Sequence, residues 1–138
     1  MTDQDYLRRA IKIGNRKEKP YNFGAVIVKD GEIIGEDFNH VRELHDPSAH
    51  AEISALKMAA KKLSDHNLNG ATMYGSHEPC LMCFSCAAWA NVARVVYAQP
   101  ANEQNFMYEF RDISLQGMVK YLTRRTISVE YIPLKTIL

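Results

Sequence analysis

The chain has 138 residues, of which 46% are hydrophobic and 24% are charged, and its formal net charge at pH 7 is +1. This length and composition predict one soluble globular domain over residues 1–138 and exclude disordered and fibrous proteins. No apolar run is long enough to span a bilayer, and the near-neutral charge argues against a domain built to grip a polyanion.

The first residues, Met1–Asp5, are polar and acidic and lack the basic and apolar stretches of an export signal. We therefore expect a cytoplasmic protein whose thiols stay reduced. The three cysteines are an odd number, which does not suit a disulfide framework. A C-x-x-C pair in a reducing compartment is more typical of metal binding or redox chemistry.

The spacing of apolar residues predicts helices and strands that alternate along the chain. The Asp30-Gly31 turn predicts that the first two strands are antiparallel neighbours. The strand–helix–strand order that starts at Ala71 predicts a parallel pair, so the fold class is α/β. The expected helices are Asp3 to near Gly14-Asn15, Asp46 to about Leu63, Cys80 to about Val92 and Ile113–Leu122; the expected strands are Phe23–Val28, Glu32–Phe38, Ala71–Ser76, Arg94–Ala98 and Ser128–Ile132.

The stretch before the second helix is polar, and residues His40–His45 are expected to form a loop. Asp46 suits the N-cap of that helix and Pro47 suits its first turn. This start would place His50 in the first turns, where unpaired backbone N–H groups favour negative charge.

One imidazole and two thiols, from His50, Cys80 and Cys83, indicate a three-ligand zinc site. The cysteines are three residues apart, so on a helix they share a face and can bind one ion, whereas His50 must come from another element. Three protein ligands leave the fourth tetrahedral position to a water, as in catalytic rather than structural zinc sites. Glu52 is not needed as a ligand, so this carboxylate is free to move protons.

Plainer explanations exist for each of these residues. Two cysteines at helical spacing are often small core residues, and a lone histidine at a helix start is usually hydrogen-bonded there. A structural zinc site would need a fourth ligand, for which Cys86 and His77 are the candidates. Cys86 lies about 9 Å along the helix axis from Cys80, so we expect a small core residue there, with a redox-sensitive thiol as the alternative. His77 is expected either to line the pocket or to be exposed in a loop.

Two stretches carry a resemblance to a known family: Asp46-Pro47-Ser48-Ala49-His50-Ala51-Glu52-Ile53 and Glu78-Pro79-Cys80-Leu81-Met82-Cys83. They match the H-x-E and P-C-x-x-C signature of zinc deaminases that act on nucleobases. The sequence resembles the cytidine and deoxycytidylate deaminase superfamily, and within it the branch of bacterial guanine deaminases and tRNA adenosine deaminases. The resemblance covers about Phe23 to Tyr97 and thins beyond it.

The resemblance implies a three-layer α/β/α fold with a five-stranded mixed sheet and Zn²⁺ as the cofactor, and it suggests substrate contacts. Asn39 stands where this branch carries an asparagine that hydrogen-bonds the base, although a turn-forming asparagine is the plainer explanation. Phe106 and Tyr108 could cap a flat ring, but such aromatics are more often core residues. The remaining candidate contacts are Ala51, His77 and the acidic Glu109.

With this resemblance, the site residues imply a zinc-dependent hydrolase that removes an exocyclic amine from a nucleobase and releases ammonia. A free base, guanine or a related aminopurine or aminopyrimidine, is favoured because the charge is near neutral and only five residues follow Pro133. The alternatives are adenosine deamination in tRNA and a silent, zinc-stabilised partner subunit, against which Glu52 argues. The superfamily also implies self-association, and the helix with Trp89 is expected to supply the surface of a homodimer.

Overall fold

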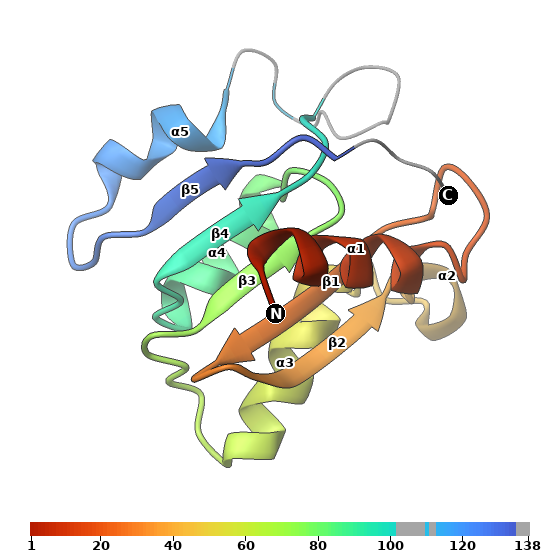
Figure 1. Cartoon of the computed structure of the whole chain (residues 1–138), viewed down its shortest axis with the longest axis horizontal. Helices are drawn as coiled ribbons and strands as arrows, with labels where there is room; N and C mark the ends of the chain where they lie inside the picture. The colour runs from red at the N-terminus through yellow and green to blue at the C-terminus, as the bar shows by residue number, and fades with distance from the viewer. Residues whose placement is uncertain (102–109, 111–112, 135–138) are drawn as a thin grey trace.

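The computed structural model describes residues 1–101, 110 and 113–134. Five strands form one sheet in the order β2-β1-β3-β4-β5, and helices cover both of its faces (Figure 1). Among the described residues, no helix is long and apolar enough to cross a membrane. The strands are β1 (Gly24–Lys29), β2 (Glu32–Phe38), β3 (Thr72–Gly75), β4 (Arg94–Tyr97) and β5 (Ser128–Tyr131); the helices are α1 (Asp3–Gly14), α2 (Val41–Leu44), α3 (Ala51–Leu63), α4 (Leu81–Trp89), α5 (Leu115–Met118) and the 3-10 helix η2 (Val119–Tyr121).

The sheet is mixed. β1 pairs antiparallel with both β2 and β3, whereas the β3–β4 and β4–β5 pairs are parallel. The hairpin at Asp30-Gly31 and the parallel β3-α4-β4 unit are therefore both as expected. All five expected strands are present, and their ends agree with the sequence pattern to within one or two residues.

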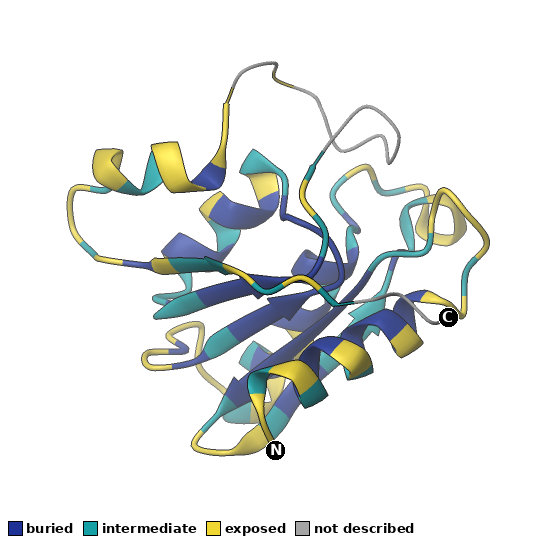
Figure 2. Cartoon of the chain, turned by 45° about the horizontal axis from the view of Figure 1, so that its top comes forward, coloured by how far each residue is buried: buried dark blue, intermediate teal, exposed yellow. Residues whose placement is uncertain are grey.

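Alternating side chains of β1 divide the core between the two faces of the sheet. Val26 and Val28 belong to a cluster with the buried residues of α1, including Leu7. Ala25 and Ile27 belong to the other cluster, which contains buried residues of α3 and α4 such as Leu56 and Phe84. Figure 2 shows this burial along the strands and on the helix sides that face them. The three-layer α/β/α fold is confirmed.

The start of α3 differs from the expected one. The helix begins at Ala51 rather than near Asp46, and His50 is its N-cap, with extended backbone angles. The reason is local: the Asp46 carboxylate accepts hydrogen bonds from the backbone N–H of Ser48 at 2.8 Å and from its hydroxyl at 2.7 Å. Asp46 therefore closes a turn of its own, as aspartate often does, and does not cap the helix.

Other helices are also shorter or placed differently than expected. The expected loop at residues 40–45 contains the single-turn helix α2, whose first backbone N–H donates to the side chain of Asn39. Helix α4 begins after its N-cap Cys80 and ends at Trp89, three residues before Val92. In place of one helix over residues 113–122, α5 and η2 follow each other, with Gly117 lowering the helical preference there.

Gly35 sets how close α3 lies to the sheet. A Cβ at this position of β2 would lie 2.3 Å from the carbonyl oxygen of Ala55 and 2.9 Å from the backbone nitrogen of Ala59. Both atoms belong to α3, so only a residue without a side chain lets this helix pack at its observed distance. Because α3 carries Glu52 and begins at His50, this contact also positions the candidate site.

Gly35→Ala is expected to lower the free energy of unfolding by about 1–3 kcal/mol, because backbone atoms must move to admit the new methyl group. Urea unfolding measures the difference. Glu32→Ala is the matched control: its carboxylate pairs with Lys62 at the exposed start of the same strand, and losing that pair costs about 0–1 kcal/mol. Equal midpoints for the two variants would contradict the proposed role of Gly35.

Candidate metal centre and active site

The three expected zinc ligands lie together where α3 and α4 begin. His50 is the N-cap of α3, Cys80 is the N-cap of α4, and Cys83 lies in the first turn of α4. The Nδ1 atom of His50 is 3.6 Å from the Sγ atom of Cys80 and 3.5 Å from that of Cys83. All three ligand atoms lie within 4.8 Å of one another. Within the described part of the chain, no other histidine, cysteine or carboxylate joins this group.

These distances fit a tetrahedral zinc ion. With Zn–S bonds of about 2.3 Å and Zn–N bonds of about 2.0–2.1 Å, ligand nitrogen and sulfur atoms at tetrahedral angles are about 3.6 Å apart. The observed separations of 3.5 and 3.6 Å match this value. One imidazole nitrogen and two thiol sulfurs are also a donor set that zinc prefers. The group can therefore hold zinc, with one coordination position left over.

The two thiols have unequal acidity. The pKa of Cys80 is lowered to about 4 by the hydrogen bond between the Cys80 and Cys83 thiols, with a further contribution from His50. The same hydrogen bond, together with burial, raises the pKa of Cys83. The pKa of His50 is raised, chiefly by its hydrogen bond to Cys80. Zinc binding would release protons from this cluster, because the ligands to zinc are thiolates and a neutral imidazole.

Glu52 lies beside the three ligands in the first turn of α3 and is only 5% exposed. Burial, followed by the charge of the Cys80 thiolate, raises the pKa of its carboxyl group to about 7. A group with such a pKa exists in both protonation states near neutral pH. Glu52 also lines the same cavity as His50 and Cys80, so a proton can pass between its carboxyl group and a molecule held there.

The cavity in front of these residues has a volume of about 660 Å³. This size is typical of sites for small molecules, which are mostly apolar with a few polar groups. Three aromatic rings contribute to its wall, those of Tyr21, Phe23 and Phe110. Among the described residues, the lining is Pro20, Tyr21, Phe23, Asn39, Val41, Pro47, His50, Glu52, Cys80, Leu81, Met82 and Phe110.

The expected substrate contacts fall into three groups. Asn39 lines the cavity, and its Oδ1 atom accepts the Val41 backbone N–H at 3.0 Å, so its NH₂ group remains the donor for a ligand. Ala51 is fully buried and His77 nearly so, and neither is among the lining residues. Phe106, Tyr108 and Glu109 lie outside the described residues.

His77 occupies a position behind the cavity wall. Its ring packs edge-on against Phe23 with 4.7 Å between ring centroids, and its Nδ1 atom lies 2.8 Å from the hydroxyl oxygen of Ser76. Burial lowers its pKa to about 4, so the ring is neutral at physiological pH. Within the described structure, His77 therefore contacts a residue of the wall.

Several lining residues were not singled out from the sequence. Leu81 and Met82 are the two residues inside P-C-x-x-C, and a signal for them existed, because they directly follow a ligand at a helix start. Pro20 and Tyr21 precede the first strand, and no motif marks them. Phe110 was not named as a contact, although it follows the candidate aromatics Phe106 and Tyr108 in the sequence; the structure places it in the wall.

Known proteins that this chain is similar to are deaminases. It is 42% identical over 101 residues to guanine deaminase from Bacillus subtilis, a match that covers 71% of this chain and 65% of the relative. It is 42% identical over 91 residues to tRNA-specific adenosine deaminase from Agrobacterium fabrum, covering 66% and 59% of the two chains. The matched stretch thus spans less than two thirds of either relative. A solved structure from work on A-to-I editing by tRNA:A34 deaminases has a TM-score of 0.78 at 28% identity, covering 93% of this chain and 91% of that one.

The family model of the cytidine and deoxycytidylate deaminase zinc-binding region matches residues 1–99. That range includes the ligand group and Glu52, and the two relatives belong to the branch that the motifs indicated. The resemblance and the assignment of zinc as the cofactor are both confirmed. The chain therefore belongs to the cytidine and deoxycytidylate deaminase family and contains the zinc-binding region of that family.

Proposed function

We propose that this protein hydrolyses an exocyclic amine on a nucleobase and releases ammonia. The observation that carries the proposal is the buried carboxyl group of Glu52, which lines one cavity with two of the three zinc ligands and is not itself a ligand. A structural zinc site has no use for such a group. Membership of a deaminase family supports the same reaction.

The reaction needs a strong nucleophile and a supply of protons, because an amine on an aromatic ring is a poor leaving group. When bound by His50, Cys80 and Cys83, zinc lowers the pKa of a coordinated water to about 7. The remaining steps are proton transfers, and Glu52 is the group placed to perform them.

Glu52 acts twice in the proposed sequence. As a carboxylate it takes the proton of the attacking water and delivers it to a ring nitrogen, which makes the amine-bearing carbon easier to attack. It then takes a second proton, from the hydroxyl group newly formed on that carbon, and transfers it to the amine, which departs as ammonia and leaves a carbonyl oxygen. The pKa of about 7 suits both directions of transfer at neutral pH. Asn39 is proposed to hold the base through its NH₂ group, and the aromatic rings of the wall to pack against the flat faces of the base.

The favoured substrate is a free base, guanine or a related aminopurine or aminopyrimidine. The cavity has the size of a small-molecule site, and none of the described residues that line it is a lysine or arginine that could bind a phosphate. The similarity to a guanine deaminase supports this choice. Glu52 also argues against a silent partner subunit, because a chain that only stabilises a complex gains nothing from burying a carboxyl group beside its zinc ligands.

The second candidate is adenosine deamination in tRNA, and one structural feature favours it. A groove beside the cavity shares Tyr21 and Asn39 with it and carries four basic side chains. Lys17 is paired with Glu43, and the Arg42 guanidinium lies 5.2 Å from the centre of the Tyr21 ring. Such a groove could bind the phosphates that flank a base in the cavity. The four basic residues are Arg16, Lys17, Lys19 and Arg42.

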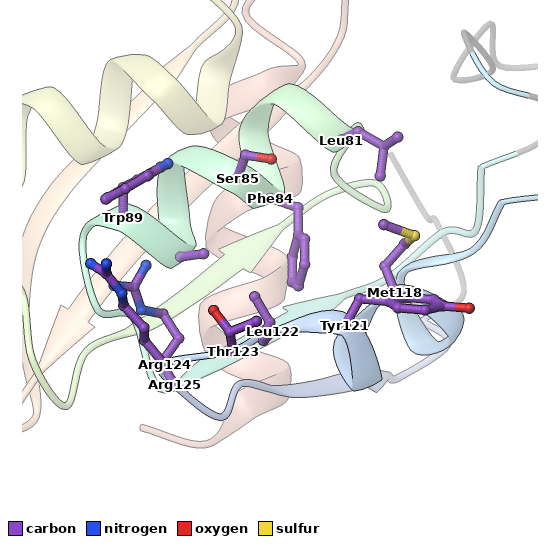
Figure 3. A pocket seen from close by; sticks show the side chains of 11 residues that line it. Leu81, Phe84, Ser85, Trp89, Met118, Tyr121, Leu122, Thr123, Arg124 and Arg125 are labelled. Atoms are coloured by element: carbon purple, nitrogen blue, oxygen red, sulfur yellow. The ribbon is translucent and has the colours of Figure 1, made fainter.

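We further propose that the protein is cytoplasmic, as expected from the sequence. We also propose that two copies of the chain associate through the outer side of α4. Trp89 is 70% exposed there, at the rim of a groove of about 470 Å³ formed with Tyr121 and the neighbouring arginines (Figure 3). The Arg125 guanidinium lies 5.5 Å from the Trp89 ring, and its buried Nε atom has no hydrogen-bond partner among the described residues. A second copy would bury Trp89.

The assigned ligands predict that replacing the three cysteines one at a time has unequal effects on zinc content. Cys80→Ser and Cys83→Ser are each expected to abolish stoichiometric zinc binding, because oxygen replaces a thiolate ligand. Cys86→Ser is the matched control and should keep one zinc per chain, since Cys86 is outside the ligand group. Metal content of the purified proteins gives the answer without an activity assay. One zinc per chain in Cys80→Ser or Cys83→Ser would contradict the proposed metal centre.

The proton-transfer role predicts that Glu52→Gln keeps zinc but loses turnover by about 10²–10⁴-fold, because an amide cannot carry the proton. Ammonia release and metal content are measured on the same samples. Glu32→Gln, an exposed carboxylate at the start of β2, should leave both unchanged. A Glu52→Gln variant with a near-normal rate would exclude Glu52 from the mechanism.

The two substrate classes predict different effects of substitutions in the basic groove. If a free base is the substrate, ammonia release from guanine, cytosine, isocytosine, adenine or a triazine is detected, and Arg16→Glu with Lys19→Glu leaves its KM unchanged. If tRNA is the substrate, inosine forms in tRNA and binding weakens as the salt concentration rises. The double variant then reduces the slope of log binding constant against log salt concentration by about 2. Gel shifts at two salt concentrations, run beside the ammonia assay, separate the classes.

A further inference from the structure

We propose that Glu78 is a positioning residue that, by binding the backbone at Ala101 and Leu115, keeps Phe110 in the cavity wall and thereby sets how substrate binds. The inference rests on the proposed function, because it concerns the wall of the same site. It assigns a task to a buried carboxyl group that the proton transfers do not use.

Glu78 is 8% exposed and lies two residues before the ligand Cys80. Its two carboxyl oxygens accept from two different backbone groups. Oε1 accepts the N–H of Ala101 at 3.0 Å, and Oε2 accepts the N–H of Leu115 at 3.3 Å. Its own backbone N–H donates to the carbonyl oxygen of Gln99 at 2.7 Å. One residue is thus bonded to three points of the chain beyond β4.

The two accepted hydrogen bonds bracket Phe110. Ala101 and Leu115 lie on either side of it in the sequence, and a single carboxyl group brings their backbones together. Phe110 in turn lines the cavity with Cys80 and Glu52. Because Glu78 and Cys80 are joined by Pro79, whose ring fixes one backbone angle, the group that anchors this part of the wall is closely tied to a zinc ligand.

The chemistry of the two contacts explains why a carboxylate suits this position. An ionised carboxylate accepts at both oxygens and forms stronger hydrogen bonds with backbone N–H groups than a neutral acceptor does. A glutamine of the same size has one acceptor oxygen and one NH₂ group, so it can satisfy only one of the two N–H donors and turns a second donor toward the other. Glu78→Gln therefore removes the anchor while changing the shape of the side chain very little.

The first measurement does not depend on activity. In the zinc-loaded protein, Glu78→Gln is expected to speed hydrogen exchange at the Ala101 or Leu115 amide by about tenfold or more, as followed by NMR, because a protecting hydrogen bond is lost. Glu36→Gln is the matched control: Glu36 also accepts two hydrogen bonds, both from Arg9, on β2. It should leave both amides unchanged. Unchanged exchange in Glu78→Gln would overturn the proposal.

The second measurement separates positioning from general loss of structure. With full zinc content, Glu78→Gln is expected to raise KM for the accepted substrate about tenfold and to change kcat by less than about threefold, because the ligands and Glu52 stay in place. A fall in kcat with unchanged KM, or loss of zinc, would assign Glu78 a structural role at the metal centre instead and overturn the proposal.

A third variant tests whether the effect passes through Phe110. If it does, Phe110→Ala raises KM by itself, and adding Glu78→Gln raises it little further, because coupled residues are not additive. Independent, multiplying effects would overturn the proposed route. If the wild-type protein releases no ammonia from any base or tRNA, the proposed function fails and the substrate part of this inference fails with it, whereas hydrogen exchange still decides whether Glu78 anchors the chain.

Discussion

The site depends on one arrangement, in which two helices begin side by side and each uses a metal ligand as its N-cap. His50 and Cys80 occupy the positions where serine, threonine or aspartate would normally accept a backbone N–H, and neither side chain makes such a bond. They point instead toward each other, 3.6 Å apart. The unpaired N–H groups of the two helix starts favour negative charge, which stabilises the Cys80 thiolate and an ionised Glu52. The helices are thus capped less well than they could be, and the site gains its ligands.

This arrangement requires that α3 and α4 keep their places on the same face of the sheet. Helix α4 is fixed by its position between the parallel strands β3 and β4, a connection whose handedness is nearly always the same. Helix α3 has no such constraint, and its distance from the sheet is set by Gly35, where no side chain separates β2 from the backbone at Ala55 and Ala59. A glycine that is not among the cavity-lining residues therefore contributes to the 3.5 Å geometry of the ligands.

Much of the fold and the ligand group follow from the sequence because their signals are local or carried by a motif. The apolar run Phe23–Val28 and the Asp30-Gly31 turn that follows it predict the first two strands, and the H-x-E and P-C-x-x-C stretches identify the metal centre. The predicted start of α3 was wrong because the Asp46 carboxylate has two possible partners, the N–H groups of the helix start and Ser48. Only the folded chain shows that it binds Ser48. The cavity wall was largely missed because Tyr21 and Phe110 reach it from connections without a motif. The expected single domain and the location of the protein stay predictions.

The substrate question reduces to which of two neighbouring surfaces supplies the binding energy. Inside the cavity the lining is mainly apolar and aromatic, so a base can be held there by its flat faces and by the Asn39 amide alone. The basic groove adds a surface for phosphates, but Lys17 is already paired with Glu43, so nucleic acid would have to compete with that carboxylate. Tyr21 and Asn39 belong to both surfaces. Because a free base occupies only the first surface and tRNA needs both, the charge of the groove is what distinguishes the two substrates physically.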